Sequence, residues 1–148
     1  MKFPRLAARA VIVHDNRLLL VNAYPNGASD LWCAPGGGVM AGQDLPTNLA
    51  REVHEETGLG IEVEGLIGIN EFKSPDDSFH QVDLFFRAHI RDGALCDDWV
   101  DPEQVVDKRR FFTHAELSGI RLKPAMLPDL AFSPAQVARY DPIEFIVG

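Results

Sequence analysis

Residues 37–59 read GGVMAGQDLPTNLAREVHEETGL, a segment that joins a glycine-rich bend to a helical pattern. Apolar side chains recur every four residues, at Leu45, Leu49 and Val53. This spacing gives one apolar stripe along an α-helix. Asp44 is a suitable N-cap, and Gly58 can end a helix in a left-handed conformation. The pattern therefore predicts a helix over residues 45–57.

Three glutamates share one face of this expected helix, namely Glu52, Glu55 and Glu56. At about 100° per residue, positions 52 and 56 are about 40° apart around the axis, so their like charges repel each other. The dipole at the C-terminal end of a helix disfavours anions as well, and only Arg51 offers a compensating charge nearby. A hard divalent cation would offset the repulsion, and Mg²⁺ favours carboxylate oxygens beside phosphates. The alternative is a solvated acidic face with an Arg51–Glu55 surface pair.

Three consecutive glycines, Gly36, Gly37 and Gly38, lie upstream of these glutamates. Glycine adopts backbone conformations that a β-carbon forbids, and it lets a ligand approach the main chain. A bend that leads directly into an acid-bearing helix would bring backbone groups and carboxylates to one place. We therefore interpret the three glycines as candidate substrate-binding residues.

With these residues named, the segment resembles the Nudix box. That motif is a glycine, five residues, a glutamate, seven residues and then Arg-Glu-hydrophobic-X-Glu-Glu-X-Gly-hydrophobic. Eight of its nine specified positions match, at Gly37, Arg51, Glu52, Val53, Glu55, Glu56, Gly58 and Leu59. Gln43 stands where the family usually has its first glutamate, so a metal-binding or orienting role for position 43 is in doubt. The resemblance implies an α/β/α sandwich with a mixed sheet.

The resemblance also implies an activity, the hydrolysis of a nucleoside diphosphate linked to another group X. A divalent cation, Mg²⁺ or alternatively Mn²⁺, would be bound by Gly37, Glu52, Glu55 and Glu56. Arg51 would orient a glutamate of the box. The general base would be a box glutamate or an acid from a later loop, for which the candidates are Asp101, Glu103 and Asp107. We take the catalytic residues to be Arg51, Glu52, Glu55 and Glu103, although each loop acid is also an ordinary surface residue by composition.

The substrate is indicated less directly. Pro75 stands sixteen residues beyond Leu59, an offset similar to that of the ADP-ribose pyrophosphatase subgroup, although Ser-Pro-Asp-Asp is also good turn sequence. ADP-ribose or a sugar nucleotide is therefore the first expectation, with Pro75 as a candidate substrate-binding residue. Four aromatic residues are candidates either for stacking on a base or for the core, namely Trp32, Phe72, Phe79 and Phe85.

Two other functions stay open. One is a house-cleaning hydrolase of oxidised nucleoside triphosphates. The other is a nucleotide-sensing domain that keeps the Nudix fold without catalysis, which the retention of Arg51 and the three box glutamates disfavours.

The rest of the chain reads as strands around one early helix, an α+β pattern in a single domain over residues 1–148. Residues 6–13 and 17–22 should form a hairpin, and 61–72, 81–90 and 109–113 further strands. Alternation in 81–90 predicts one largely buried face. Thr113 should cap a short helix through 117, and residues 142–147 are either a terminal strand or a docked tail.

The amino-acid composition excludes some classes of binding partner. Fourteen basic and twenty-two acidic residues give a net charge of −8, which disfavours a general nucleic-acid binder. Two cysteines without a CxxC pair suit a reducing cytosol. The N-terminus reads as a strand and no apolar run is long enough to span a membrane, so we expect a cytoplasmic protein. The expected partner is a small nucleotide substrate, and the resemblance adds a possible homodimer.

Overall fold

The first two strands form the predicted hairpin in the computed structural model, which describes residues 3–133, 138–140 and 144–145 of the chain. Strands β1 (Arg5–His14) and β2 (Arg17–Asn22) pair antiparallel. The two residues between them, Asp15 and Asn16, have positive φ angles of 50° and 62°. Short polar side chains tolerate this conformation, which matches the twist of a tight hairpin.

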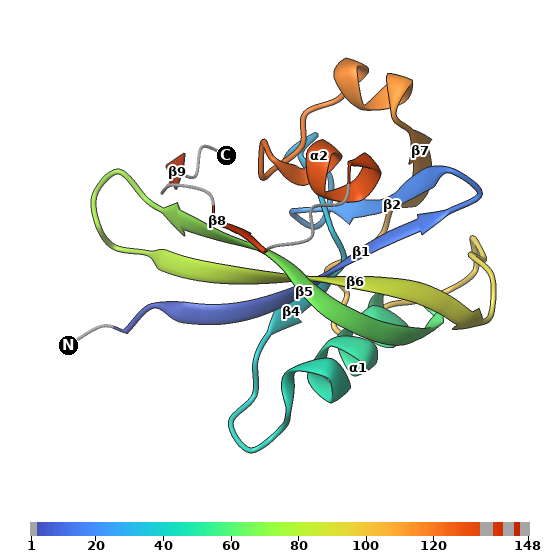
Figure 1. The fold of residues 1–148 in the computed structure, drawn as a ribbon, viewed down its shortest axis with the longest axis horizontal. Coiled ribbons are helices and arrows are strands. Elements are labelled where there is room, and N and C mark those ends of the chain that lie inside the picture. Colours follow the sequence, from blue (N-terminus) through green and yellow to red (C-terminus); the bar gives the residue numbers. More distant parts are fainter. Residues whose placement is uncertain (1–2, 134–137, 141–143, 146–148) are drawn as a thin grey trace.

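The strands form one mixed sheet (Figure 1). Its order is β3-β2-β1-β6-β5-β8, with β4 paired to β1, β7 to β2 and β9 to β5. Strand β6 runs parallel to β1 and antiparallel to β5. The remaining strands are β3 (Trp32–Cys33), β4 (Gly36–Gly38), β5 (Gly60–Lys73), β6 (His80–Asp92), β7 (Arg109–Thr113), β8 (Arg139–Tyr140) and β9 (Glu144–Phe145).

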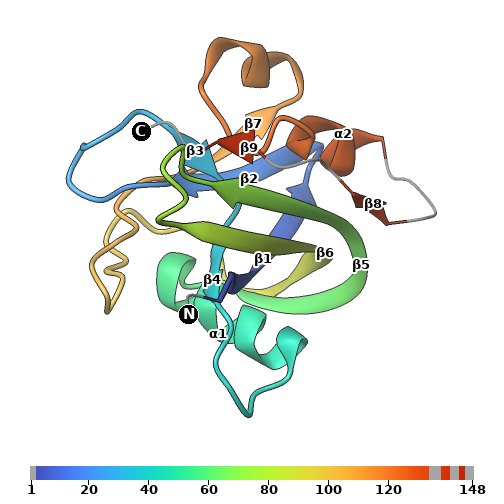
Figure 2. The ribbon, with the colours of Figure 1, turned by 90° about the vertical axis from the view of Figure 1, so that its left-hand side faces the viewer.

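Helices cover the sheet on opposite sides (Figures 1 and 2). Helix α1 (Leu45–Thr57) closes one apolar core, which contains Leu49 and Val53. Helix α2 (Leu127–Phe132) lies over the second core, and the 3₁₀ helix η1 (Ala115–Gly119) adds Leu117 to it. The predicted α+β sandwich with a mixed sheet is therefore confirmed.

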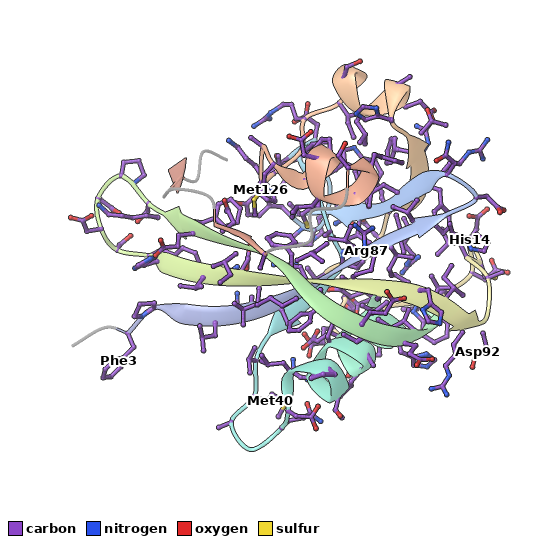
Figure 3. The ribbon with its side chains drawn as sticks, in the orientation of Figure 1. Phe3, His14, Met40, Arg87, Asp92 and Met126 are labelled. Carbon is purple, nitrogen blue, oxygen red and sulfur yellow. The ribbon has the colours of Figure 1, made fainter. Side chains whose placement is uncertain are left out.

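Arg87 on β6 fastens α2 to the sheet (Figure 3). Its guanidinium donates to the carbonyls of Leu130 and Ala131 at 2.5 and 3.3 Å. The last carbonyls of a helix lack partners within the helix, and a cation there also suits the helix dipole. Arg87 thus satisfies the C-terminal end of α2.

The expected single buried face of residues 81–90 is wrong in its first half. Gln81 and Asp83 are buried there, whereas Val82 and Leu84 are only half-buried. The two polar residues share a face of β6 that looks into a cavity, so burial there follows from the position of the strand and not from the alternation. Further along, Phe85 and Phe86 are both buried because the sheet is covered on both sides.

A short helix follows β7 as expected, but its N-cap position is His114 and not Thr113, and it extends to Gly119 and not 117. The Thr113 hydroxyl accepts the Glu116 N–H at 3.3 Å, and the Glu116 carboxylate accepts the Thr113 N–H at 2.8 Å, which starts η1. Within residues 142–147, Glu144–Phe145 pairs with β5, and the other residues of that prediction lie outside the described part. No helix in the described ranges is long and apolar enough to cross a membrane.

Substitution of Gly58 tests the contact that the Trp99 ring makes at the C-terminal end of α1. Both Gly58 and Gly42 have positive φ, of 77° and 84°. A β-carbon on Gly58 would lie 2.9 Å from the Trp99 ring, whereas one on Gly42 would meet nothing within 4 Å. We expect Gly42→Ala to cost about 1–2 kcal/mol of unfolding free energy from backbone strain alone, and Gly58→Ala to cost more. Urea denaturation measures both, and equal losses would contradict the contact with Trp99.

Candidate active site

Helix α1 is fixed at its start by local contacts. The Asp44 carboxylate accepts the Thr47 N–H at 2.8 Å, and this hydrogen bond lowers the pKa of Asp44. Asn48, which is fully buried, ties the helix to the glycine bend. Its side chain accepts the Met40 N–H at 3.0 Å and donates to the Gly38 carbonyl at 3.1 Å. The bend and the helix are therefore one structural unit.

The glycine bend needs the absence of side chains. Gly36 has a φ of 145°, and a β-carbon there would lie 2.1 Å from the Ala8 carbonyl oxygen on β1. A β-carbon on Gly37 would lie 2.7 Å from the Glu52 carboxylate. Glycine thus lets β4 pair closely with β1 and lets a carboxylate of α1 lie directly against the bend.

Glu56 is the most deeply buried of the three glutamates, at 9% exposure. Its carboxylate accepts the Gly36 N–H at 2.9 Å. Burial raises the pKa of Glu56 to about 8, against the opposing effects of Arg9 and the Gly36 hydrogen bond. Burial also raises the pKa of Glu52, against Arg51 and with the charges of Glu55 and Glu103 adding to the rise. Negative charge is therefore under-compensated here.

Arg51 holds two of the glutamates together. Its guanidinium lies 3.1 Å from the Glu55 carboxylate and 3.3 Å from that of Glu52. The Gln43 side-chain oxygen accepts a hydrogen bond from the Arg51 Nε at 3.4 Å. The amide of Gln43 thus offers Arg51 an acceptor that carries no negative charge.

The chemistry of these side chains suits a divalent cation, whereas their present arrangement does not form a complete binding site. Within the described residues, no three His, Cys, Asp or Glu side chains converge closely enough to hold a metal ion. Glu52 is engaged by Arg51 and Glu56 by the Gly36 N–H. The second oxygen of Glu55, however, is buried and has no hydrogen-bond partner. An orphaned carboxylate oxygen beside two further carboxylates is a donor set suited to a hard cation.

A cavity of about 350 Å³ collects most of the predicted site residues. Those that line it are Gly36, Gly37, Gly38, Glu52, Glu55, Glu56, Asp101 and Glu103. Arg51 lies behind the glutamates and does not line the cavity. Pro75 is exposed in the loop between β5 and β6 and is not part of the lining, and Asp107 borders a separate hollow. The structure does not bring these last two to the site.

The loop acids differ in what they contact. Asp101 is 3% exposed, and its carboxylate accepts the N–H groups of Glu103, Val105 and Val106 at 2.9, 3.2 and 2.9 Å. Asp101 therefore shapes the loop. Glu103 is exposed and lines the cavity together with the glutamates of α1, which favours it as a base over Asp101 and Asp107.

The aromatic candidates divide between cavity and core. Phe72, Phe79 and Phe85 line the cavity, although Phe85 is fully buried and also belongs to the core. Trp32 does not line it and packs edge-on against Phe112 with ring centroids 5.0 Å apart. Of these four candidates, only Phe79, at 38% exposure, is an exposed residue of the lining. Tyr24, which was not among them, also lines the cavity and is half-buried.

Sequence reasoning missed a polar row on the cavity floor, where β1 and β6 run side by side. Arg5 donates to Gln81 at 2.6 Å, Gln81 donates to Asp83 at 2.8 Å, and the Asp83 carboxylate lies 3.8 Å from the Arg9 Nε. Arg9 also donates to the Gly36 carbonyl at 3.3 Å. The signal was Arg9 itself, a charge within an apolar strand. Two guanidinium groups thus bring positive charge to the cavity of an acidic protein.

The chain is similar in sequence to known proteins over much of its length. An ADP-ribose pyrophosphatase of Methanocaldococcus jannaschii is 30% identical over 92 residues, which are 62% of this chain and 54% of that protein. A MutT-like protein of Streptomyces ambofaciens is 32% identical over 126 residues, 80% of this chain and 74% of that protein. The chain thus spans about half the length of the first relative.

Solved structures show the same fold. The crystal structure of a UDP-X diphosphatase matches with a TM-score of 0.73 at 23% identity, over 95% of this chain and 68% of that chain. The family model of the NUDIX domain matches residues 4–136, which include the glycine bend, α1 and the cavity residues. The chain therefore belongs to the NUDIX domain family.

Proposed function

We propose that this protein hydrolyses the diphosphate linkage of a nucleoside diphosphate joined to another group, with Mg²⁺ as the first candidate cofactor and Mn²⁺ as the second. The observation that carries the proposal is the meeting of three elements in one cavity. These are the glutamates of α1, the glycine bend and the acid of a later loop, Glu103. Family members generally use divalent metals, which agrees with the orphaned oxygen of Glu55.

The carboxylates of Glu52, Glu55 and Glu56, with the Gly37 carbonyl, would hold the cation. When bound, it neutralises charge on the phosphate oxygens and the leaving group. Arg51 keeps Glu52 and Glu55 oriented through its two ion pairs. Its role is positional because it does not line the cavity.

Glu103 acts as the general base. It accepts a proton from the water that attacks one phosphorus, while the bond from that phosphorus to the bridging oxygen breaks and the departing phosphate keeps the electron pair. The Arg5 and Arg9 guanidinium groups donate to phosphate oxygens from the cavity floor. The open main chain of Gly36–Gly38 lets the substrate lie close to it.

ADP-ribose or a sugar nucleotide is the proposed substrate class. The relative from Methanocaldococcus jannaschii is named an ADP-ribose pyrophosphatase, and one structural neighbour is a UDP-X diphosphatase. Phe79 at the cavity edge can stack on a base or a sugar. A role for Pro75 in substrate choice stays a proposal, and the exposed position of Pro75 does not support it.

The second candidate function is hydrolysis of oxidised nucleoside triphosphates, which the name of the MutT-like relative favours. A panel of ADP-ribose, UDP-glucose, a dinucleoside tetraphosphate and 8-oxo-dGTP, each with Mg²⁺, Mn²⁺ or EDTA, separates the candidates. We expect ADP-ribose to give AMP and ribose 5-phosphate only with a metal. Fastest turnover of 8-oxo-dGTP would favour the second function. Tight nucleotide binding without turnover of any substrate would make the protein a sensor.

A further inference from the structure

The C-terminal end of α1 is closed by groups from inside and outside the helix. The Val53 and His54 carbonyls accept hydrogen bonds from the Thr57 hydroxyl and the Gly58 N–H, at 2.6 and 2.8 Å. The next carbonyl, that of Glu55, accepts the indole N–H of Trp99 at 2.9 Å. The carbonyl of Glu56 accepts the Nε–H of Arg109. The carbonyls of two site glutamates are therefore capped from elsewhere in the chain.

One outside donor, Trp99, belongs to the connection between β6 and β7, residues 93–108, and the other, Arg109, is the first residue of β7. Trp99 is half-buried while Asp98 and Val100 beside it are exposed, Val100 at 71%. The Trp99 ring lies against Gly58 and meets the His54 ring edge-on, with centroids 5.3 Å apart. Trp99 thus docks this connection onto the C-terminal end of α1, and further along the connection Asp101 and Val106 are buried.

Arg109 fixes the other end of this connection. Besides capping α1, its guanidinium donates to the Val106 carbonyl at 3.1 Å. Asn22 of β2 holds the same region, because its side chain accepts the N–H groups of Asp107 and Lys108, both at 2.9 Å. Residues 99–109 therefore form a frame attached to α1 at one end and to α1 and β2 at the other.

Glu103 belongs to this frame. Its N–H is held by the buried Asp101 carboxylate, and Glu103 lines the same cavity as the α1 glutamates. Among the described contacts, no hydrogen bond joins the Glu103 side chain to α1. Its distance from the glutamates is consequently set by the frame and not by a contact of its own.

We propose that Trp99 is a positioning residue, whose hydrogen bond to the Glu55 carbonyl holds the Glu103 carboxylate at a set distance from the α1 glutamates. The inference rests on the proposed function, since it needs Glu103 to act on the substrate. A base and a metal site must keep their separation to within a fraction of an ångström, because a misplacement of about 1 Å can cost about 100-fold in rate. Because Trp99 attaches the loop that carries Glu103 to the Glu55 carbonyl, the base and the α1 glutamates move together.

The test is a double-mutant cycle. Trp99→Phe keeps a ring against Gly58 and removes the indole N–H. We expect it to lower kcat about 10-fold with KM changed by less than about 2-fold, because the hydrogen bond that holds the frame to α1 is lost and the base shifts. In the Glu103→Gln background the same substitution should change kcat by less than about 2-fold, because no base remains to be misplaced.

Trp32→Phe is the matched control, since it is the same substitution at the chain's other tryptophan, which is half-buried and packs against the core. It should change the melting temperature without changing the ratio of kcat between the two backgrounds. If Trp99→Phe fails to fold, Gly58→Ala in the same cycle displaces the ring instead of removing its N–H.

Two outcomes overturn the inference. An equal loss of kcat in both backgrounds would make Trp99 a purely structural residue. Wild-type kcat in Glu103→Gln alone would show that Glu103 does no chemistry. In either case metal-dependent turnover of the substrate panel by the wild-type protein would leave the proposed function standing, so the two failures are distinguishable.

Discussion

Replacing Glu56 with glutamine is expected to lower kcat by roughly 10²–10³-fold at saturating Mg²⁺, the size of effect seen when one charge-stabilising group is removed from an active site. Glutamine keeps an acceptor for the Gly36 N–H, which lies 2.9 Å from the Glu56 carboxylate. The fold should therefore survive while the negative charge available to a cation is lost. Steady-state hydrolysis of the best substrate of the panel, measured over a range of Mg²⁺ concentrations, checks this expectation.

Glu62→Gln is the matched control, because Glu62 is an exposed carboxylate on β5 that pairs with His89 at 3.6 Å, outside the cavity. It should leave kcat within about 2-fold of the wild-type value, as is usual for a surface substitution away from a site. Near-normal turnover of Glu56→Gln at saturating Mg²⁺ would show that Glu56 carries no essential metal.

The second large effect is the dependence of the free energy of unfolding on pH in the absence of divalent cations. Burial raises the pKa of Glu56 to about 8, from an ordinary value of 4.5. Between these two pH values the folded state binds the proton that the unfolded state has released, so the free energy of unfolding falls as pH rises. The fall is at most about 1.4 kcal/mol per pH unit, and it is complete once the pH passes the folded pKa.

Urea denaturation in EDTA at pH 5 and pH 8 measures this slope. The wild-type protein should lose several kcal/mol over this interval relative to Glu56→Gln, whose amide does not titrate. Glu52 and Asp83, whose pKa values burial also raises, titrate in both proteins, so the difference reports the titration of Glu56 together with its charge coupling to Glu52. Adding Mg²⁺ at pH 8 should restore stability to the wild type more than to the variant. Parallel pH curves for the two proteins would contradict the buried, proton-holding state of Glu56.

Local physics was sufficient for much of the fold. The helix over residues 45–57 follows from a four-residue apolar period, a carboxylate at the N-cap and a glycine at the C-cap, and all three act within the helix itself. The hairpin likewise follows from two polar residues that accept positive φ. The box spacing placed Glu52, Glu55 and Glu56 on one face, and the structure has them lining one cavity.

The sequence was less informative where position depends on which strands become neighbours. Alternation could not show that Gln81 and Asp83 would be buried, because their burial results from the parallel pairing of β6 with β1. The same pairing places Arg5 beside Gln81 across a separation of 76 residues. No local period carries that information.

By itself, then, the sequence determined the elements whose causes lie within a few residues, which are the capped helix, the glycine bend and the row of glutamates. Tertiary structure alone decided which distant groups surround them. It put Arg9 on the cavity floor, Trp99 on the end of α1 and Glu103 in the same cavity as the glutamates, and it left Pro75 outside the cavity. The physical reason is that hydrogen bonding and capping within a helix are short-range, whereas the surroundings of a charge depend on chain segments that meet only when the sheet closes.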